Sequence, residues 1–219
     1  MSAPVLAAEG PARRAFRRRL LAWYRRHGRD LPWRRTRDPY RVLVSEVMLQ
    51  QTQVSRVIPK YREWLRRYPS LEALASASTG DVREAWHPLG YNVRPVRLRS
   101  IARTVVRRHG GRLPRSRDGL LALKGVGAYT AGAVLSFAFG EDAAILDTNV
   151  RRVLRRVWAG EHRQVPDRAL WALAARLLPR GRAYDFNQGL MDLGAMVCTA
   201  RRPRCRACPL ARMCASYPL

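Results

Sequence analysis

Leu123-Lys124-Gly125-Val126-Gly127 is one of the two most informative segments of this chain. Two glycines around a valine favour a tight turn whose backbone N–H groups point outward. The helix predicted to begin near Thr130 adds the positive end of its dipole, so the turn can bind a phosphate without reading bases. Between helices such a pattern is usually only a turn. It gains weight because Ile145-Leu146-Asp147-Thr148-Asn149 follows and predicts a carboxylate at the start of the next helix.

Apolar residues recur at helical spacing through most of the 219 residues, and no alternating run predicts a strand. The apolar fraction of 47% is ample for a core, and the length fits one domain or two small lobes. The fold class is therefore predicted to be all-α. Helices are expected over residues 12–26, 42–53, 57–68, 71–77, 81–86, 96–109, 130–139, 149–158, 167–178 and 186–197.

Four cysteines, the only ones in the chain, lie near its C-terminus with the spacing C-x6-C-x2-C-x5-C: Cys198, Cys205, Cys208 and Cys214. Four soft thiolates in so short a segment can enclose a zinc ion or an iron–sulphur cluster. A pair of disulfides or separate buried thiols is the alternative. One CxxC flanked by longer gaps favours the cluster over zinc. A metal-binding thiol set also predicts a protein of the reducing cytosol.

The charge of the chain predicts nucleic acid as its partner. There are 42 basic and 16 acidic residues, a formal net charge of +26, and a field of this size attracts polyanions. A compositional bias explains why Lys60 and Lys124 are the only lysines, but it does not explain the few acids. No apolar run suits a transmembrane helix or a signal peptide, so we expect a cytoplasmic, nucleoid-associated protein without membrane contact.

In this order, the motifs resemble the helix-hairpin-helix DNA glycosylases of the endonuclease III and MutY superfamily, from about Leu31 to Cys214. Residues 31–34, 45–52, 89–91 and 186–188 are similar to the catalytic domain of MutY-type adenine glycosylases. The resemblance implies two helical lobes, double-stranded DNA with a mismatched or damaged base as partner, and a [4Fe–4S] cluster rather than zinc. Lys124 departs from the proline that is usual in the family's hairpin.

The resemblance also implies how the chain divides. Residues 31–141 are expected to form a six-helix lobe that contains the hairpin 123–127, in which Gly125, Val126 and Gly127 bind a DNA phosphate. Residues 1–30 and 142–219 are expected to form the iron–sulphur lobe, with the cluster loop at 198–214. We expect the protein to act as a monomer.

Cleavage of a purine N-glycosidic bond needs an acid that protonates the base and a carboxylate that stabilises the cationic sugar. Glu46 is the only acid in a mostly apolar predicted helix. It either pairs with Arg41 or Arg56 or, as the resemblance implies, is the general acid, with a pKa raised by burial. Asp147 is an ordinary helix N-cap and, by resemblance, also the carboxylate that stabilises the sugar, with Asn149 helping to orient it.

Tyr129 separates two branches of the family. The bifunctional endonuclease III type has a lysine at this position, which attacks the sugar and leads to strand cleavage. Because tyrosine cannot form that Schiff base, the resemblance implies a monofunctional glycosylase. Tyr129 is then expected to pack near the sugar, unless it is simply a buried core residue.

Further residues match positions that contact the everted base or the duplex. Gln51 and Tyr91 match residues that wedge into the gap left by base flipping. The base pocket is expected to include Trp33, Arg34 and Gln188. The arginines after Tyr91 are expected either to contact phosphates or to form a solvated face: Arg94, Arg97 and Arg99.

Removal of mispaired adenine, opposite guanine or 8-oxoguanine, is the predicted function, because the amides of Gln50, Gln51 and Gln188 can read the adenine edge. MIG-type thymine/uracil mismatch glycosylases are the alternative, since residues 110–115 resemble a stretch of theirs. A non-catalytic DNA-binding module is a third reading, which the presence of both carboxylates disfavours. The chain ends soon after Cys214, without the further domain by which full-length MutY proteins recognise 8-oxoguanine, so a weaker preference for that base is expected.

Overall fold

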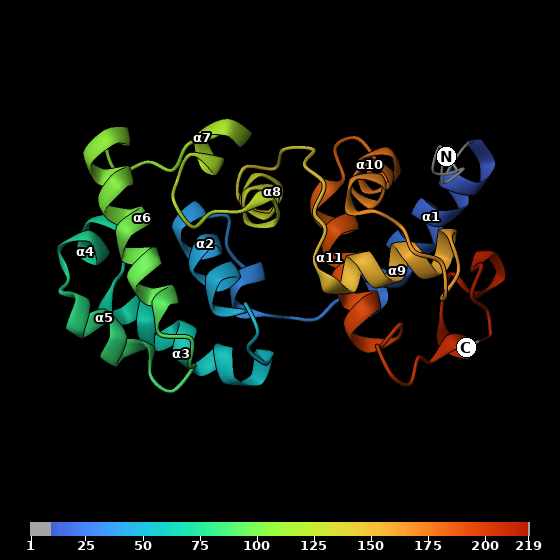
Figure 1. The fold of residues 1–219 in the computed structure, drawn as a ribbon, viewed down its shortest axis with the longest axis horizontal. Coiled ribbons are helices and arrows are strands. Elements are labelled where there is room, and N and C mark those ends of the chain that lie inside the picture. Colours follow the sequence, from blue (N-terminus) through green and yellow to red (C-terminus); the bar gives the residue numbers. More distant parts are fainter. Residues whose placement is uncertain (1–9, 219) are drawn as a thin grey trace. The chain divides into compact units, whose positions relative to one another are not determined.

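The computed structural model describes residues 10–218, which form two compact units (Figure 1). The central unit is Asp30–Phe139, and the terminal unit combines the residues up to Arg29 with those from Gly140 onward. The described residues form eleven α-helices and three short 3-10 helices, with no strand, which confirms the all-α prediction.

Helix α2 (Pro39–Met48) is the core of the central unit. Every residue from Tyr40 to Met48 is buried except Arg41, and a helix that is apolar on all sides must be covered on all sides. It packs against α3 (Val54–Arg67), α6 (Val93–His109) and α8 (Ala128–Phe137), and Figure 1 shows it between α6 and α8. This packing holds the C-terminal turn of α2 in a fixed place.

Short capped helices complete the central unit. Ser70 caps α4 (Leu71–Ser76), and Ser78 forms a capping box with Asp81 at the start of α5 (Thr79–Trp86). Both helices pack on α6, which ends at Gly110 in the left-handed conformation that glycine adopts without strain. The remaining elements are η1 (Pro32–Arg34) and α7 (Arg117–Leu121).

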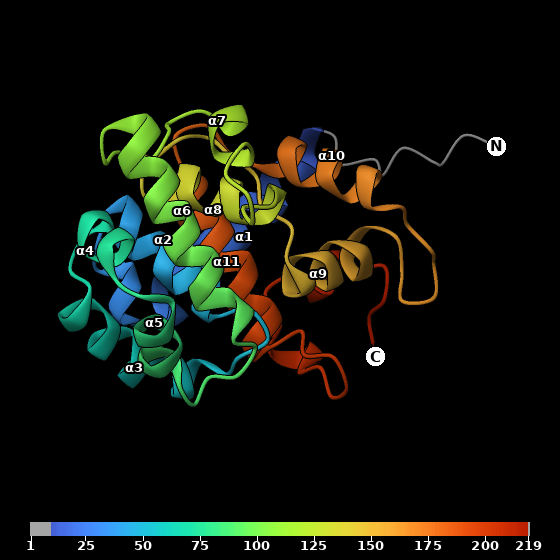
Figure 2. The same cartoon turned by 60° about the vertical axis from the view of Figure 1, so that its left-hand side comes forward.

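The terminal unit is built around α11 (Ala183–Met196). This helix packs against α1 (Gly10–His27) and α9 (Thr148–Trp158), while α10 (Asp167–Leu177) lies beside α9 (Figure 2). Asp192 of α11 is fully buried and pairs with the Arg29 guanidinium at 2.6 Å. Two single-turn helices, η2 (Cys205–Ala207) and η3 (Ala211–Met213), follow α11 in the cysteine-rich segment.

Three helix predictions need correction. The helix expected over residues 42–53 is α2, which begins at Pro39 behind an Asp38 cap and ends at Met48. It stops there because Gln51 has a positive φ of 54°, which an α-helix cannot contain. Helix α7 was not predicted, because five residues are too few for a helical apolar period. The central unit therefore has seven α-helices, where six were expected.

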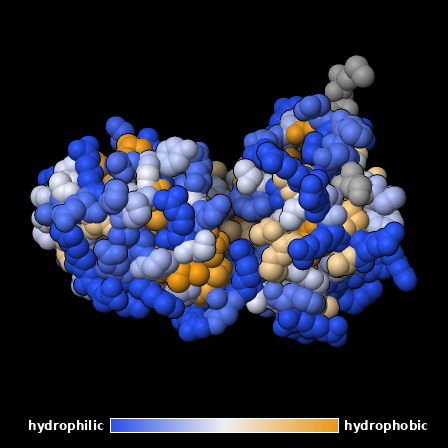
Figure 3. Space-filling model, turned by 90° about the horizontal axis from the view of Figure 1, so that it is seen from below, coloured by the Kyte–Doolittle hydropathy of each residue, from blue (hydrophilic) through white to orange (hydrophobic). Residues whose placement is uncertain are grey.

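Hydrophilic side chains dominate the face of each unit that Figure 3 shows. This agrees with the formal net charge of +26. Among residues 10–218, no helix has both the length and the apolar character needed to cross a membrane.

Candidate active site

Glu46 and Tyr129 meet inside the central unit. Glu46 lies in the last turn of α2 and is only 3% exposed, and the hydroxyl of Tyr129, in the first turn of α8, donates a hydrogen bond to its Oε2 at 2.7 Å. The two side chains can meet because α2 packs against α8. A carboxylate buried on an apolar helix needs such a donor, since an unpaired buried acid is costly.

The predicted phosphate-binding turn joins α7 to α8. Leu123 and Val126 are buried and anchor it, while Gly125 and Gly127 are exposed. Gly125 has a φ of +103°, a conformation that favours glycine. Gly127 caps α8 with a φ of −92°, which any residue adopts, and a Cβ there would meet no atom within 4 Å. The space beside Gly127 is therefore free of protein atoms.

The other predicted residues of the central unit differ in exposure. Trp33 of η1 is 6% exposed and packs edge-on against Tyr61, with ring centroids 5.5 Å apart, so its ring is largely part of the core. Arg34 is half-buried. Gln51 and Tyr91 are exposed, Tyr91 to 61%, and both have a positive φ.

Asp147 caps α9 in the terminal unit. Its Oδ1 accepts the Val150 N–H at 2.7 Å, and its Oδ2 accepts the Asn149 side-chain N–H at 3.0 Å. Burial raises the pKa of Asp147 above its ordinary value and outweighs these hydrogen bonds, which act to lower it. The N-cap role predicted from sequence is therefore confirmed, and the same carboxylate is held in one orientation.

Arg152 links this carboxylate to the cysteine-rich segment. It donates hydrogen bonds to Asn149 Oδ1 at 2.7 Å, to the Cys198 carbonyl at 2.7 Å and to the Gly194 carbonyl at 2.8 Å. The backbones of Asn149 and Gly194 are so close that a Cβ on Gly194 would lie 2.6 Å from the Asn149 Cβ. The sequence did not single out Arg152, since nothing there separates it from its many neighbouring arginines.

Gln188 is 4% exposed in α11. Its neighbour Asn187 is 2% exposed and donates to the Ala143 carbonyl at 2.8 Å. The predicted residues thus fall into two groups. The central unit holds Trp33, Arg34, Glu46, Gln51, Tyr91, Gly125, Val126, Gly127 and Tyr129, and the terminal unit holds Asp147, Asn149 and Gln188.

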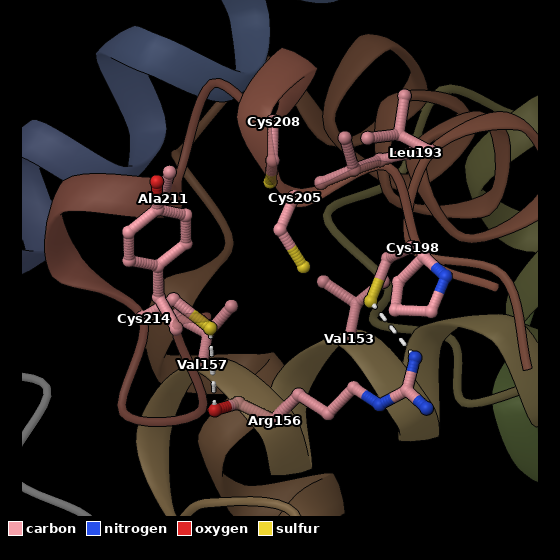
Figure 4. Close-up of a pocket in the computed structure, with 12 residues that line it drawn as sticks. Val153, Arg156, Val157, Leu193, Cys198, Cys205, Cys208, Ala211 and Cys214 are labelled. Atoms are coloured by element: carbon pink, nitrogen blue, oxygen red, sulfur yellow. Dashed lines mark hydrogen bonds between the residues drawn. The ribbon is translucent and has the colours of Figure 1, made fainter. Parts of the chain in front are cut away.

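All four cysteines are free thiols that line one cavity, so no disulfide joins them. The rest of the wall is mostly apolar, and Figure 4 shows the sulphur atoms of Cys198 and Cys205 directed into the space between them. Burial raises the pKa of the Cys208 thiol to about 11. Within residues 10–218, no three His, Cys, Asp or Glu side chains converge as a site for a metal ion.

Arg156 of α9 closes one side of this cavity. It is 4% exposed and approaches the Cys198 sulphur at 3.6 Å, and it also donates to the Thr199 carbonyl at 2.7 Å. Glu161 pairs with it at 2.6 Å, and this partner raises the Arg156 pKa. The carbonyl oxygen of Arg156 accepts from the Cys214 thiol at 3.5 Å.

Comparisons with known proteins agree with this arrangement. Residues 44–177 match the family described as "HhH-GPD superfamily base excision DNA repair protein". The adenine DNA glycosylase of Homo sapiens is 47% identical over 212 residues, which cover 91% of this chain and 39% of the human protein. This chain therefore spans less than half of that relative.

Shorter relatives match over almost their whole length. The thymine-DNA glycosylase of Aeropyrum pernix is 43% identical over 93% of this chain and 94% of its own length. The solved structure of a thermostable thymine-DNA glycosylase aligns with a TM-score of 0.88 and 37% identity, over 94% of this chain and 96% of that one. By both its sequence and its fold, this chain belongs to the HhH-GPD superfamily of base excision DNA repair proteins.

Proposed function

We propose that this chain is a monofunctional DNA glycosylase that removes mispaired adenine, opposite guanine or 8-oxoguanine, by hydrolysis of the N-glycosidic bond. The observation that carries the proposal is the Glu46 carboxyl group, 3% exposed and held by the Tyr129 hydroxyl at 2.7 Å. A buried acid on an apolar helix, oriented by a neutral donor, suits a group that must deliver a proton.

Glu46 is the general acid in this proposal. In this proposal the carboxylic proton of Glu46 is on Oε1, because Oε2 accepts from Tyr129. Glu46 passes this proton to the ring of the everted adenine, the bond between C1′ and the base breaks, and its electron pair leaves with the base. Tyr129 lacks an amine that could attack C1′, so the product is an abasic site in an unbroken strand.

Asp147 stabilises the positive charge that develops on the sugar. Both of its oxygens accept N–H donors, from Val150 and Asn149, and Arg152 holds Asn149 in turn. A carboxylate fixed in this way needs no reorganisation when the cationic sugar forms. Water then adds to C1′ and loses a proton, which restores the carboxylic acid of Glu46 and completes the hydrolysis.

Double-stranded DNA is the proposed partner, bound by the chain as a monomer. The net charge of +26 supports attraction to the phosphate backbone. The turn Gly125-Val126-Gly127 stands at the N-terminus of α8, and its two glycines are exposed, which supports a contact to one phosphate. Trp33, Arg34 and Gln188 are proposed to contact the everted base, and Gln51 and Tyr91 to fill the gap that it leaves.

Cys198, Cys205, Cys208 and Cys214 are proposed to hold a [4Fe–4S] cluster. Four thiols on the walls of one largely apolar cavity suit a group of several atoms, and an all-thiol donor set suits iron–sulphur ligation. When bound, the cluster would join the four thiolates to one another. Residues 198–214 would then be fixed, with Arg156 donating to the Cys198 sulphur.

Thymine or uracil removal is the second candidate, because the identity to the Aeropyrum pernix thymine-DNA glycosylase, 43%, is close to the 47% identity to the human adenine DNA glycosylase. Adenine is preferred because the amide side chain of Gln188, one of the proposed base contacts, offers both a donor and an acceptor to the adenine edge.

The experiment that tests the function is base release under single-turnover conditions from duplexes that contain A·8-oxoguanine, A·G, T·G or U·G. We expect adenine release from the first two, with strand scission only after alkali. Release of thymine or uracil without adenine would establish the second candidate. Tight binding to these duplexes without release of any base would indicate a non-catalytic DNA-binding module.

A further inference from the structure

Arg94, in the first turn of α6, is a buried cation that no carboxylate neutralises in the described part of the chain. Its exposure is 4%, and its only hydrogen bonds are to backbone carbonyls and one hydroxyl group. Burial lowers the pKa of Arg94, but a guanidinium stays charged at any physiological pH. A buried charge without an ionic partner is costly, so its environment must compensate through many hydrogen bonds. With an exposure of 4%, Arg94 fits neither of the two alternatives given for it from the sequence, a phosphate contact or a place in a solvated face.

The acceptors of Arg94 belong to two separate loops. Nη1 donates to the carbonyls of Val47 and Met48, at 3.2 and 3.0 Å, and to that of Gln50. These carbonyls lie at or just after the C-terminus of α2. Backbone oxygens there lack partners within the helix, and this is the negative end of the helix dipole. Nη2 donates to the hydroxyl of Thr52 at 3.1 Å, so Arg94 fastens the whole segment 47–52.

The second loop follows α5. The same Nη2 donates to the carbonyls of Leu89 at 3.3 Å and Gly90 at 3.1 Å. The guanidinium also lies over two rings, 5.2 Å from the centroid of Trp86 and 5.5 Å from that of Tyr91. One planar, forked side chain therefore joins the loop after α2 to the loop after α5.

Each of these loops contains one strained residue. Gln51, with a φ of 54°, and Tyr91, with a φ of 49°, are the only non-glycine residues with a positive φ in the described part of the chain. Such a conformation is strained in a residue with a side chain and persists only where the surroundings enforce it. Both side chains are exposed, and the Tyr91 ring lies against the Arg94 guanidinium. Arg94 is the group that bonds to both loops.

We propose that Arg94 is a positioning residue, which clamps the two loops and holds Gln51 and Tyr91 ready as a pair to fill the gap in the duplex. The proposal rests on the proposed function, in which these two residues replace the everted base. A clamp of this kind removes the need to order the loops when the base leaves the stack, so it acts on base opening and leaves the chemistry at Glu46 unchanged.

The test compares Arg94→Met, which keeps an unbranched side chain without donors, with Arg99→Met. Arg99 lies on the same helix and donates to the Ala77 carbonyl, away from both loops. Hydrogen exchange reports the clamp directly and does not depend on any activity. We expect faster exchange of residues 49–53 and 88–92 in Arg94→Met, and wild-type exchange there in Arg99→Met. Unchanged exchange in Arg94→Met would overturn the clamp.

The role of the clamp is tested by single-turnover release of adenine from two duplexes. In one, adenine faces guanine; in the other it faces an abasic site, where opening costs less. Arg94→Met is expected to slow release from the paired duplex by about tenfold to a hundredfold, and much less from the other. Equal slowing on both duplexes would refute the positioning role.

If Arg94→Met does not fold, Arg94→Lys, which keeps the charge without the planar fork, is expected to show the same selective loss. Absence of base release from the wild-type protein would refute the proposed function. The hydrogen-exchange comparison would still show whether Arg94 holds the two loops.

Discussion

The Tyr129 hydroxyl and the Glu46 Oε2 atom lie 2.7 Å apart, although their residues come from helices far apart in the sequence. The hydrogen bond forms because α2 is buried on all sides and packs against α8, directly after the glycine turn. The α8 turn that follows the proposed phosphate-binding glycines therefore also holds the proposed acid. A hydroxyl in this place orients a proton donor without offering a nucleophilic amine.

The wild-type protein is expected to release base without cutting the strand. Borohydride added during the reaction should trap no covalent complex with DNA, because Tyr129 cannot form a Schiff base. Lys124, in the exposed turn, is the first residue to suspect if nicking occurs. A covalent complex that disappears in Lys124→Ala would contradict the monofunctional mechanism.

Asp147→Asn should separate catalysis from stability. Burial raises the folded-state pKa of Asp147, so folding favours the protonated carboxyl group. The stability that Asp147 contributes is therefore complete below about pH 3.9 and is lost as the pH rises through the folded-state pKa. Asparagine still caps α9 and carries no charge. We therefore expect the variant to be at least as stable as wild type in urea at pH 7, with this relative advantage shrinking toward pH 4, while base release nearly disappears. A variant that is less stable at pH 7 would show that the charged form is favoured.

The two glycines of the turn should respond differently to alanine. Gly125→Ala forces a φ of +103° on a side chain and should lower the free energy of unfolding by roughly 1–3 kcal/mol. Gly127→Ala should fold as wild type, since its φ is −92° and its Cβ would meet no atom within 4 Å. It should nevertheless bind duplex DNA about tenfold more weakly, roughly 1.4 kcal/mol, because the methyl group obstructs the phosphate. Wild-type affinity of Gly127→Ala in fluorescence anisotropy would argue against a phosphate at this turn.

Cys205→Ser tests the proposed cluster. Anaerobically purified wild-type protein should be brown and contain iron and acid-labile sulphide in equal amounts, and the variant should lose most of both. Ala207→Ser, an exposed change in the same segment, is the matched control and should retain them. Bound zinc without sulphide in the wild-type protein would contradict the assignment.

The sequence was informative where local patterns determine structure. The apolar run of α2, the glycine turn and the Asp147 cap could be predicted because each depends on neighbouring residues. The end of α2 was predicted too late, because it is set by Gln51 and by Arg94 from another helix. Helix boundaries of this kind depend on tertiary contacts that no window of sequence contains.

The buried arginines could not be predicted for a similar reason. Arg94, Arg152 and Arg156 each donate to several carbonyls, yet in a chain so rich in arginine they are indistinguishable by sequence from solvated ones. The composition predicted a cationic surface. It gave no sign that some of the arginines are buried and donate hydrogen bonds to backbone carbonyls. Only burial and donor geometry separate the two groups.

The most direct test of the central proposal is the rate of adenine release by Glu46→Gln under single-turnover conditions. Glutamine keeps an oxygen that can accept from Tyr129, but its amide group is not acidic and cannot protonate the base. Base release should fall by about 10²–10⁴-fold while affinity for the mismatched duplex is kept. Glu63→Gln, a half-exposed change on α3, is the control and should behave as wild type. Release by Glu46→Gln at the wild-type rate would contradict the assignment of Glu46 as the general acid.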